Sequence, residues 1–290
     1  MAGARRAAVL GSPVAHSLSP VLHDAAYEAL GLRGWTYERV ECTAEQLPAL
    51  VGGLDGSWVG LSVTMPGKKA ALAVASEASG RARRLGVANT LVRTDGGWVA
   101  DCTDVDGVAG ALRAAGVPQP APLAAGLRDV VVLGAGATAS AAVGGLYELG
   151  NEDVTLVVRD PARAVETVAV IDAYGMRGLV RTFGRVGEVD LARAKALVNT
   201  TPAGVVDDAL ADGLVAGLPD DAVVLDAVYH PWPTPLAAAA GRRGLAVATG
   251  LDMLLHQAFG QVEQFTGCSA PRREMHRALV RATRFDVRPP

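Results

Sequence analysis

Four clusters of small polar residues interrupt an otherwise apolar sequence, and their types suit a small polar substrate. The first cluster, His16-Ser17-Leu18-Ser19-Pro20, places two hydroxyls directly before an expected helix. Hydroxyls beside the free N–H groups of a helix N-terminus can bind a carboxylate. The alternative is that Ser19 only caps this helix, with Pro20 in its first turn.

The other three clusters contribute a lysine, an amide and aspartates. They are Ser62-Val63-Thr64-Met65-Pro66-Gly67-Lys68, Gly86-Val87-Ala88-Asn89-Thr90 and Asp101-Cys102-Thr103-Asp104-Val105-Asp106-Gly107. Interconversion of a hydroxyl and a ketone needs a proton donor and acceptor beside the carbon that exchanges hydride. A lysine next to an aspartate can serve, because the pair fixes the ammonium and partial burial brings its pKa into range. A lone lysine, by contrast, is usually a solvated charge.

A dinucleotide-binding turn is indicated where an apolar run meets a helical stretch, in Val130-Val131-Val132-Leu133-Gly134-Ala135-Gly136-Ala137-Thr138-Ala139. Gly134 permits a tight turn, Gly136 lets the backbone approach a pyrophosphate, and Ala139 allows close packing of helix on strand. The N-terminus of the helix would supply N–H groups to the phosphates. The alternative is a glycine turn that binds no ligand.

The end of the next strand tests which nucleotide this turn would bind. An NAD site places Asp or Glu there to hold the ribose 2′-hydroxyl. Here the strand ends in Arg159 and Asp160, with Arg163 one turn later. Arg159 and Arg163 could bind a 2′-phosphate, so the pattern favours NADP(H), although Asp160 could instead hold a ribose. Arg159 and Asp160 could also form only a surface ion pair.

Composition argues against several classes of protein. The 290 residues are 50% hydrophobic and 20% charged, with a formal net charge of −3, which disfavours general disorder and a nucleic-acid partner. Cys42, Cys102 and Cys268 form no metal or disulfide pattern and are expected to be buried thiols. The histidines lack metal-ligand spacing, and no segment combines the length and apolarity of a membrane span. We therefore expect a cytoplasmic protein without a metal.

The order of apolar runs and helical spacings predicts an α/β fold. In the first hundred residues short strands alternate with helices, among them a helix over 68–78 and a hairpin at 89–101. Residues 112–127, rich in Pro, Ala and Gly, are interpreted as a surface connection. The rest is typical of a doubly wound parallel sheet. Its expected strands are 129–133, 154–159, 196–199, 223–226 and 245–248, and two further helices are expected at 252–265 and 272–283.

On these clusters the sequence resembles the shikimate dehydrogenase family, because eight family motifs occur in order along nearly the whole chain. They are Ser17-Leu18-Ser19-Pro20, Ser62 to Lys68, Asn89-Thr90, Thr103 to Gly107, Gly134 to Thr138, Asn199 to Gly204, Asp226 to Leu236 and Gly250 to Ala258. The resemblance implies two domains. An N-terminal α/β substrate domain would comprise 1–103 and the C-terminal helices 251–290, and a Rossmann-type NADP-binding domain with a doubly wound parallel sheet would comprise 104–250.

The resemblance also implies a role for each matching residue. Lys68 and Asp104 would be the catalytic pair, with Lys68 the proton donor in ketone reduction. The substrate carboxylate would be bound by Ser17, Ser19 and Tyr229, and the ring hydroxyls by Thr64, Asn89, Asp104 and Gln257. The cofactor would be bound by Gly134, Gly136, Ala137, Thr138, Arg159, Arg163, Thr201, Gly250 and Met253.

The implied activity is the NADP-dependent, reversible reduction of 3-dehydroshikimate to shikimate in aromatic amino-acid biosynthesis. We expect a monomer or homodimer with no nucleic-acid or membrane partner. Some departures keep alternatives open: Ser62 and Cys102 stand where many relatives have Asn, and Val158-Arg159-Asp160 replaces Asn-Arg-Thr. The nearest alternatives are an NAD-dependent quinate/shikimate dehydrogenase and an aminoshikimate dehydrogenase. A nucleotide-binding protein without activity and a methyltransferase are more distant.

Overall fold

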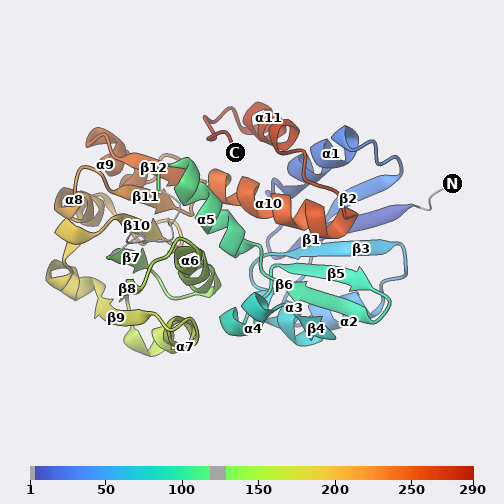
Figure 1. Cartoon of the computed structure of the whole chain (residues 1–290), viewed down its shortest axis with the longest axis horizontal. Coiled ribbons are helices and arrows are strands. Elements are labelled where there is room, and N and C mark those ends of the chain that lie inside the picture. Colours follow the sequence, from blue (N-terminus) through green and yellow to red (C-terminus); the bar gives the residue numbers. More distant parts are fainter. Residues whose placement is uncertain (1–3, 118–128) are drawn as a thin grey trace. The chain divides into compact units, whose positions relative to one another are not determined.

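The computed structural model describes residues 4–117 and 129–290, and the chain divides into two compact units. The first unit comprises Met1–Thr103 with Leu254–Pro290, and the second comprises Asp104–Met253. Each unit contains one six-stranded sheet with helices packed against it (Figure 1). The predicted α/β class is therefore confirmed.

The sheet of the first unit has the strand order β2-β1-β3-β5-β6-β4. Its strands are β1 (Arg5–Gly11), β2 (Trp35–Glu41), β3 (Trp58–Val63), β4 (Glu77–Ala78), β5 (Thr90–Thr94) and β6 (Gly97–Asp101). The strands β1, β2 and β3 are parallel, whereas β5 runs antiparallel to both β3 and β6. Thr94 pairs with Gly97, so the predicted hairpin is confirmed.

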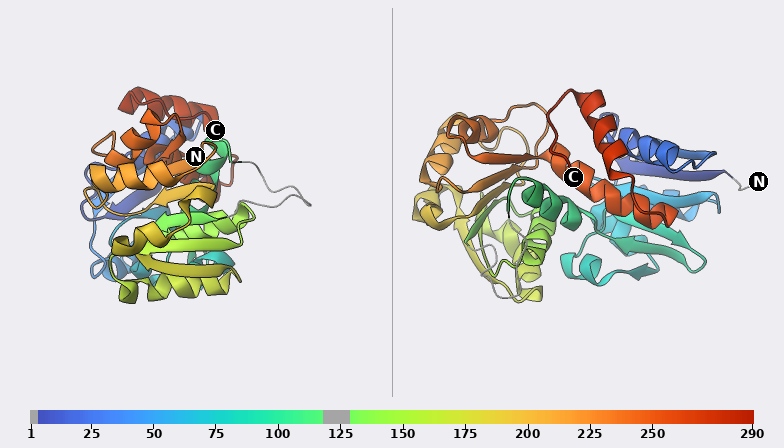
Figure 2. Two further views of the ribbon diagram at one scale, coloured as in Figure 1. Left: turned by 90° about the vertical axis from the view of Figure 1, so that its left-hand side faces the viewer. Right: turned by 45° about the horizontal axis from the view of Figure 1, so that its top comes forward.

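Helices cover both faces of this sheet (Figure 2). They are α1 (Ser19–Ala29), α2 (Leu47–Gly52), α3 (Lys68–Val74), α4 (Gly80–Leu85), α10 (Gly250–Thr266) and α11 (Arg272–Thr283). Successive residues of a strand point to opposite faces. Leu61 and Val63 of β3 accordingly pack in the core beneath α2 and α3. Gly60 faces α10, where an added Cβ would lie 2.2 Å from the Phe265 ring, so only glycine allows this helix to lie so close.

Three local predictions for the first unit are wrong. The helix expected over 68–78 ends at Val74, because Glu77–Ala78 pairs with β6. Ser19 does not cap α1: the helix begins at Ser19 itself, and Leu18 in the cap position makes no side-chain hydrogen bond. Cys268 is exposed in the turn after α10, although Cys42 and Cys102 are buried free thiols as expected.

The second unit contains a parallel sheet with the strand order β12-β11-β10-β7-β8-β9. Its strands are β7 (Val130–Leu133), β8 (Asp153–Val158), β9 (Arg177–Thr182), β10 (Ala196–Asn199), β11 (Val223–Asp226) and β12 (Ala246–Thr249). Numbered within the unit, this order is 3-2-1-4-5-6, the order of a doubly wound dinucleotide-binding sheet. Ligands of such sheets bind at the carboxyl ends of the strands, where the order reverses between β7 and β10.

Two groups of helices pack against this sheet (Figures 1 and 2). They are α5 (Asp104–Ala114), α6 (Ala137–Glu148) and α7 (Val165–Ala173) in one group, and α8 (Asp208–Gly217) and α9 (Pro235–Arg242) in the other. Alternate side chains of β7, Val131 and Leu133, share a core with Leu214 of α8 and Leu236 of α9. Three short 3₁₀ segments, Pro161–Ala164, Phe183–Glu188 and Leu191–Arg193, join the elements.

The second unit departs from the predicted elements at its edges. The connection expected at 112–127 begins later, because α5 continues to Ala114; residues 118–128 lie outside the described part. The edge strand β9 was not predicted, since its arginines and exposed positions hide the strand pattern. In the described part of the chain, no helix has the length and apolarity needed to cross a membrane.

Candidate active site

The two serines of the first cluster are hydrogen-bonded to each other at the start of α1. The Ser17 hydroxyl donates to Ser19 Oγ at 3.2 Å and accepts from the Ser19 backbone N–H at 3.3 Å. Ser19 is buried and Ser17 is half-buried. Because Ser19 does not cap α1, the capping interpretation is wrong. Both hydroxyls therefore lie side by side at a helix N-terminus, an arrangement that suits an anion.

The turn after β3 positions the candidate lysine. The Thr64 N–H donates to Leu10 O at 2.8 Å, and the Gly67 N–H donates to Thr64 O at 2.9 Å, which closes the turn. Lys68 then begins α3, and its carbonyl accepts from the Ala88 N–H at 2.9 Å. This bond fixes the lysine backbone beside the residue that precedes Asn89. The Lys68 side chain is half-buried.

Asn89 and Gln257, 168 residues apart, meet in a buried amide cluster. The Asn89 side-chain N–H donates to Gln257 Oε1 at 3.3 Å and to Thr103 Oγ1 at 3.1 Å. Asn89 Oδ1 accepts from the Thr103 N–H at 2.8 Å. Gln257 is anchored to its own helix, because its amide N–H donates to Leu254 O at 2.9 Å. The first unit thus brings together two of the residues predicted to hold ring hydroxyls.

Asp104 follows Thr103 directly and begins α5 as a buried residue of the second unit. Lys68 belongs to the first unit. The pairing of these two side chains stays a prediction.

The glycine turn has the geometry that a pyrophosphate site needs. Gly134 has a φ of +104°, and an added Cβ would lie 2.6 Å from Thr200 Oγ1, so only glycine fits. At Gly136 an added Cβ would meet nothing within 4 Å, which leaves open space beside the backbone. No side chain caps the N-terminus of α6, where Ala137 and Thr138 form the first turn. The residues present therefore fit a bound dinucleotide phosphate.

The two candidate arginines, Arg159 directly after β8 and Arg163 in the following 3₁₀ turn, are exposed, and so is Asp160. The Asp160 carboxylate accepts from the Ala162 N–H at 3.0 Å and so caps the 3₁₀ turn Pro161–Ala164. Among the described residues, no hydrogen bond or ion pair is found for the guanidinium of Arg159 or of Arg163. The surface ion pair between Arg159 and Asp160 is thus absent from the described part. The two guanidinium groups beside this turn fit a 2′-phosphate.

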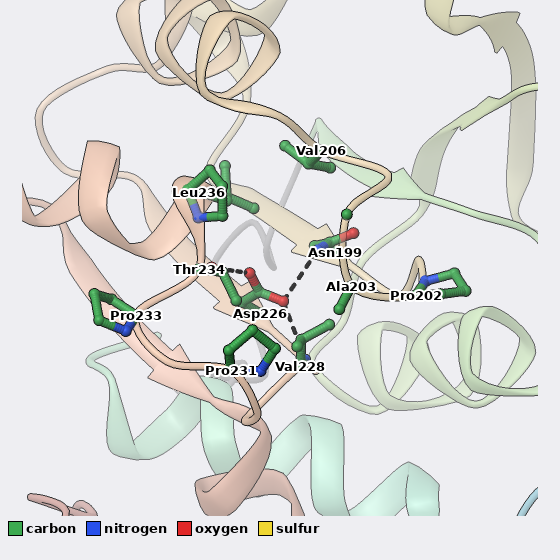
Figure 3. A pocket seen from close by; sticks show the side chains of 12 residues that line it. Asn199, Pro202, Ala203, Val206, Asp226, Val228, Pro231, Pro233, Thr234 and Leu236 are labelled. Carbon is green, nitrogen blue, oxygen red and sulfur yellow. Dashed lines mark hydrogen bonds between the residues drawn. The ribbon is translucent and has the colours of Figure 1, made fainter.

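The carboxyl ends of β10 and β11 are joined by a buried carboxylate. Asp226 accepts from the Asn199 amide at 3.0 Å, the Val228 N–H at 3.1 Å and the Thr234 hydroxyl at 2.6 Å, as Figure 3 shows. Burial raises the pKa of Asp226, and these three hydrogen bonds oppose the rise. Asn199 in turn accepts from the Thr201 hydroxyl at 2.6 Å. Asp226 therefore fixes the loop that carries Thr201.

A small pocket lies between the two loops that Asp226 joins (Figure 3). Its volume is about 60 Å³, far below that of an ordinary ligand site. Four prolines, Pro202, Pro231, Pro233 and Pro235, contribute to its lining. We interpret it as a gap between braced loops, not as the nucleotide site.

Tyr229 and Gly250 lie against each other. An added Cβ at Gly250 would lie 2.2 Å from Ala227 O and 3.0 Å from Tyr229 Cδ1, so the tyrosine ring can approach only a glycine. Tyr229 is half-buried, and burial raises the pKa of its hydroxyl, which keeps it protonated at neutral pH. Met253 follows in the first turn of α10 and is buried.

Sequence reasoning missed two buried residues beneath the first-unit site, Tyr37 and Gln261, and the side-chain role of Ser62. The Tyr37 hydroxyl donates to Ser62 Oγ at 2.6 Å, and the Ser62 hydroxyl donates to Gln261 Oε1 at 2.7 Å. One signal was available, because Gln261 lies four residues after Gln257 and therefore on the same face of its helix. In the described residues, no three His, Cys, Asp or Glu side chains are grouped as metal ligands.

Comparison with known proteins identifies the family. Residues 9–91 match the shikimate dehydrogenase substrate binding domain, and residues 250–280 match the shikimate 5′-dehydrogenase C-terminal domain. A shikimate dehydrogenase (NADP(+)) of Thermus thermophilus is 36% identical over 96% of this chain and 98% of its own length.

Solved structures agree. Mycobacterium tuberculosis shikimate dehydrogenase superposes with a TM-score of 0.85 at 52% identity, covering 96% of this chain and 99% of that one. A Thermus thermophilus shikimate 5-dehydrogenase, solved in complex with NADP(H) and shikimate, gives a TM-score of 0.80 at 34% identity, covering 96% and 99%. Identity above 30% along nearly the whole length means that this chain belongs to the shikimate dehydrogenase family.

Proposed function

We propose that this chain catalyses the NADP-dependent, reversible reduction of 3-dehydroshikimate to shikimate, a step of aromatic amino-acid biosynthesis. The observation that carries the proposal is the buried cluster of Asn89, Gln257 and Thr103. Side-chain amides fixed by one another suit a polyhydroxylated ring, because a site built to hydrogen-bond hydroxyls rejects analogues that lack them. Most of the residues assigned to the substrate belong to the first unit, and those assigned to the cofactor belong to the second.

The substrate residues divide by the group that each one binds. Ser17, Ser19 and Tyr229 are assigned to the carboxylate, because each offers a hydroxyl that stays protonated at neutral pH. Thr64, Asn89, Asp104 and Gln257 are assigned to the ring hydroxyls. Hydrogen bonds around Asn89 and Gln257 leave these amides little freedom to turn, which lowers the entropy lost on binding.

Proton transfer is assigned to Lys68 and Asp104. In the direction of reduction, the Lys68 ammonium donates a proton to the carbonyl oxygen as it becomes a hydroxyl. Asp104 hydrogen-bonds that hydroxyl and keeps the ammonium oriented. In the reverse direction the neutral lysine accepts the same proton.

NADP(H), when bound, supplies or accepts the hydride at its nicotinamide ring. The backbone at Gly134, Gly136, Ala137 and Thr138 would hold its pyrophosphate, and Arg159 and Arg163 its 2′-phosphate. Thr201, Gly250 and Met253 would line the nicotinamide end. The capping role of Asp160 supports NADP over NAD, because one oxygen of that carboxylate is engaged by the Ala162 N–H.

The decisive experiment measures kcat/KM for shikimate and quinate, each with NADP⁺ and with NAD⁺. We expect kcat/KM for shikimate with NADP⁺ to exceed that of every other combination by roughly tenfold or more. Tenfold corresponds to about 1.4 kcal/mol of transition-state stabilisation. A higher kcat/KM for quinate with NAD⁺ would instead support the quinate/shikimate dehydrogenase alternative. Activity on an amino analogue of shikimate would support the aminoshikimate dehydrogenase alternative. NADPH binding without any turnover would make the chain an inactive nucleotide-binding protein.

Assembly and location complete the proposal. We assign the chain to the cytoplasm as a monomer or homodimer. Two buried free thiols, Cys42 and Cys102, suit a reducing compartment. Light scattering during size-exclusion chromatography separates the monomer from the homodimer.

A further inference from the structure

A buried line of hydrogen bonds runs beneath the candidate substrate site of the first unit. It begins at Tyr37, whose hydroxyl donates to Ser62 Oγ at 2.6 Å; Ser62 then donates to Gln261 Oε1 at 2.7 Å. Burial raises the pKa of Tyr37, while hydrogen bonds with Ser62 and Ser19 oppose the rise. Ser19 is one of the two serines proposed to bind the carboxylate, so the line begins beside that part of the site.

Gln261 extends this line of hydrogen bonds to Asn89 and Thr90. Its amide N–H groups donate to Asn89 O at 3.1 Å and to Thr90 Oγ1 at 3.1 Å. Its oxygen accepts from Ser62, so both ends of the amide are engaged, and only 1% of the residue is exposed. A flipped amide would point N–H groups at the Ser62 donor and an oxygen at the Asn89 carbonyl. The orientation of Gln261 is therefore fixed.

Gln261 and the backbone of Thr103 together fix the orientation of Asn89. Because Thr90 Oγ1 accepts from Gln261, its own hydrogen is directed to Asn89 Oδ1, at 2.7 Å. Asn89 Oδ1 also accepts from the Thr103 N–H. With its oxygen engaged by these donors, Asn89 must present its NH₂ group on the side of Gln257.

We propose that Gln261 is a positioning residue, which fixes the Asn89 amide for a substrate hydroxyl and joins it through Ser62 and Tyr37 to the carboxylate-binding serines. This inference rests on the proposed function, since it deepens the account of the same substrate site. Gln261 itself touches no reacting atom. Its effect is exerted through Thr90 and Asn89.

A purely structural role would be to dock α10 on the sheet, and the chain offers a matched control for it. Gln264 lies three residues further along the same helix and donates to Asp101 Oδ2 at 2.7 Å. It too bonds the sheet, but no hydrogen bond joins it to Asn89, Thr90 or Ser62 in the described residues. Gln264→Met thus removes a helix-docking bond without altering the line.

The test compares Gln261→Met with Gln264→Met in the full-length protein, by steady-state kinetics and thermal unfolding. We expect both variants to lower Tm. Only Gln261→Met should raise the KM for shikimate, by at least tenfold, with an unchanged KM for NADP⁺. An unchanged KM for shikimate in Gln261→Met, or an equal rise in both variants, overturns the proposal.

A second pair of variants keeps the test informative if Gln261→Met does not fold. Thr90→Val removes the hydroxyl that accepts a hydrogen bond from Gln261 and donates one to Asn89, whereas Thr90→Ser retains it. We expect Thr90→Val to raise the KM for shikimate at least fivefold and Thr90→Ser to stay within twofold of the wild type. Equal values in the two variants overturn the proposal. A wild-type chain inactive on shikimate would refute the proposed function itself, a distinct result.

Discussion

Acid should destabilise this protein through His23, a histidine buried without an ionic partner in the described part of the chain. His23 is 0% exposed, and its ring stacks on that of Tyr37 with centroids 3.9 Å apart. Burial lowers the pKa of His23 to about 3 from 6.5, although the Gln261 side chain partly opposes the shift. The native state therefore excludes a proton that the unfolded chain accepts.

The sign and size of the effect follow from proton linkage. Above pH 6.5 His23 is neutral in both states and contributes no pH dependence. Between pH 6.5 and 3 the unfolded chain binds one proton more, so the free energy of unfolding falls by about 1.4 kcal/mol per pH unit. From about pH 8 to about pH 4.5 this single group removes about 2.7 kcal/mol, a large part of an ordinary domain's stability.

The assay is urea unfolding of the wild type and of His23→Phe at several values between about pH 8 and about pH 4.5. Phenylalanine keeps an aromatic ring against Tyr37 but cannot bind a proton. The variant should lose stability less steeply than the wild type, by up to about 1.4 kcal/mol per pH unit. His16→Phe is the matched control. Because His16 is exposed, this variant should keep the wild-type slope of the free energy of unfolding against pH. Parallel curves for the wild type and His23→Phe would refute the reasoning.

Three further predictions concern the candidate site. Lys68→Ala should lower kcat far more than it raises KM, because a proton-transfer group acts mainly in the transition state; steady-state rates check this, and a pure KM effect contradicts it. Arg159→Ala should weaken NADPH roughly tenfold to a hundredfold while leaving NADH nearly unaffected; calorimetric titration with both cofactors checks this, and equal losses would remove its assigned role. Thr234→Val should lower the free energy of unfolding, measured in urea, by about 2 to 4 kcal/mol, because it removes a donor to the buried Asp226 and the cap of α9, whereas Thr234→Ser should cost under half as much.

Features set by neighbours in the sequence could be predicted from it. The turn at Gly134 follows an unbroken apolar strand and precedes a helix of small residues, and the structure places β7, the turn and α6 there. The Thr94–Gly97 hairpin is determined in the same way by local turn residues. In both cases the backbone conformation depends on residues close by in the chain.

Elements at the edges of the sheets could not be predicted in this way. The six residues of β9 include two arginines and a glycine, and half of them are exposed, so neither alternation nor an apolar run appears. Their strand conformation depends on pairing with β8, which a local pattern does not record. The same reason ends α3 early, since Glu77–Ala78 adopts a strand only because β6 lies beside it.

Side-chain partners far apart in the sequence explain what the motifs alone left open. Whether Asp160 holds a ribose or serves the backbone cannot be decided from its position, but its bond to the Ala162 N–H favours the backbone role. Ser62 stands where many relatives have Asn, and on the motif alone it looked like a departure from the family pattern. Its hydroxyl instead bonds Gln261, 199 residues later, so the shorter side chain belongs to a network completed from a distant helix. A substitution inside a motif therefore has to be judged together with the residues that pack against it.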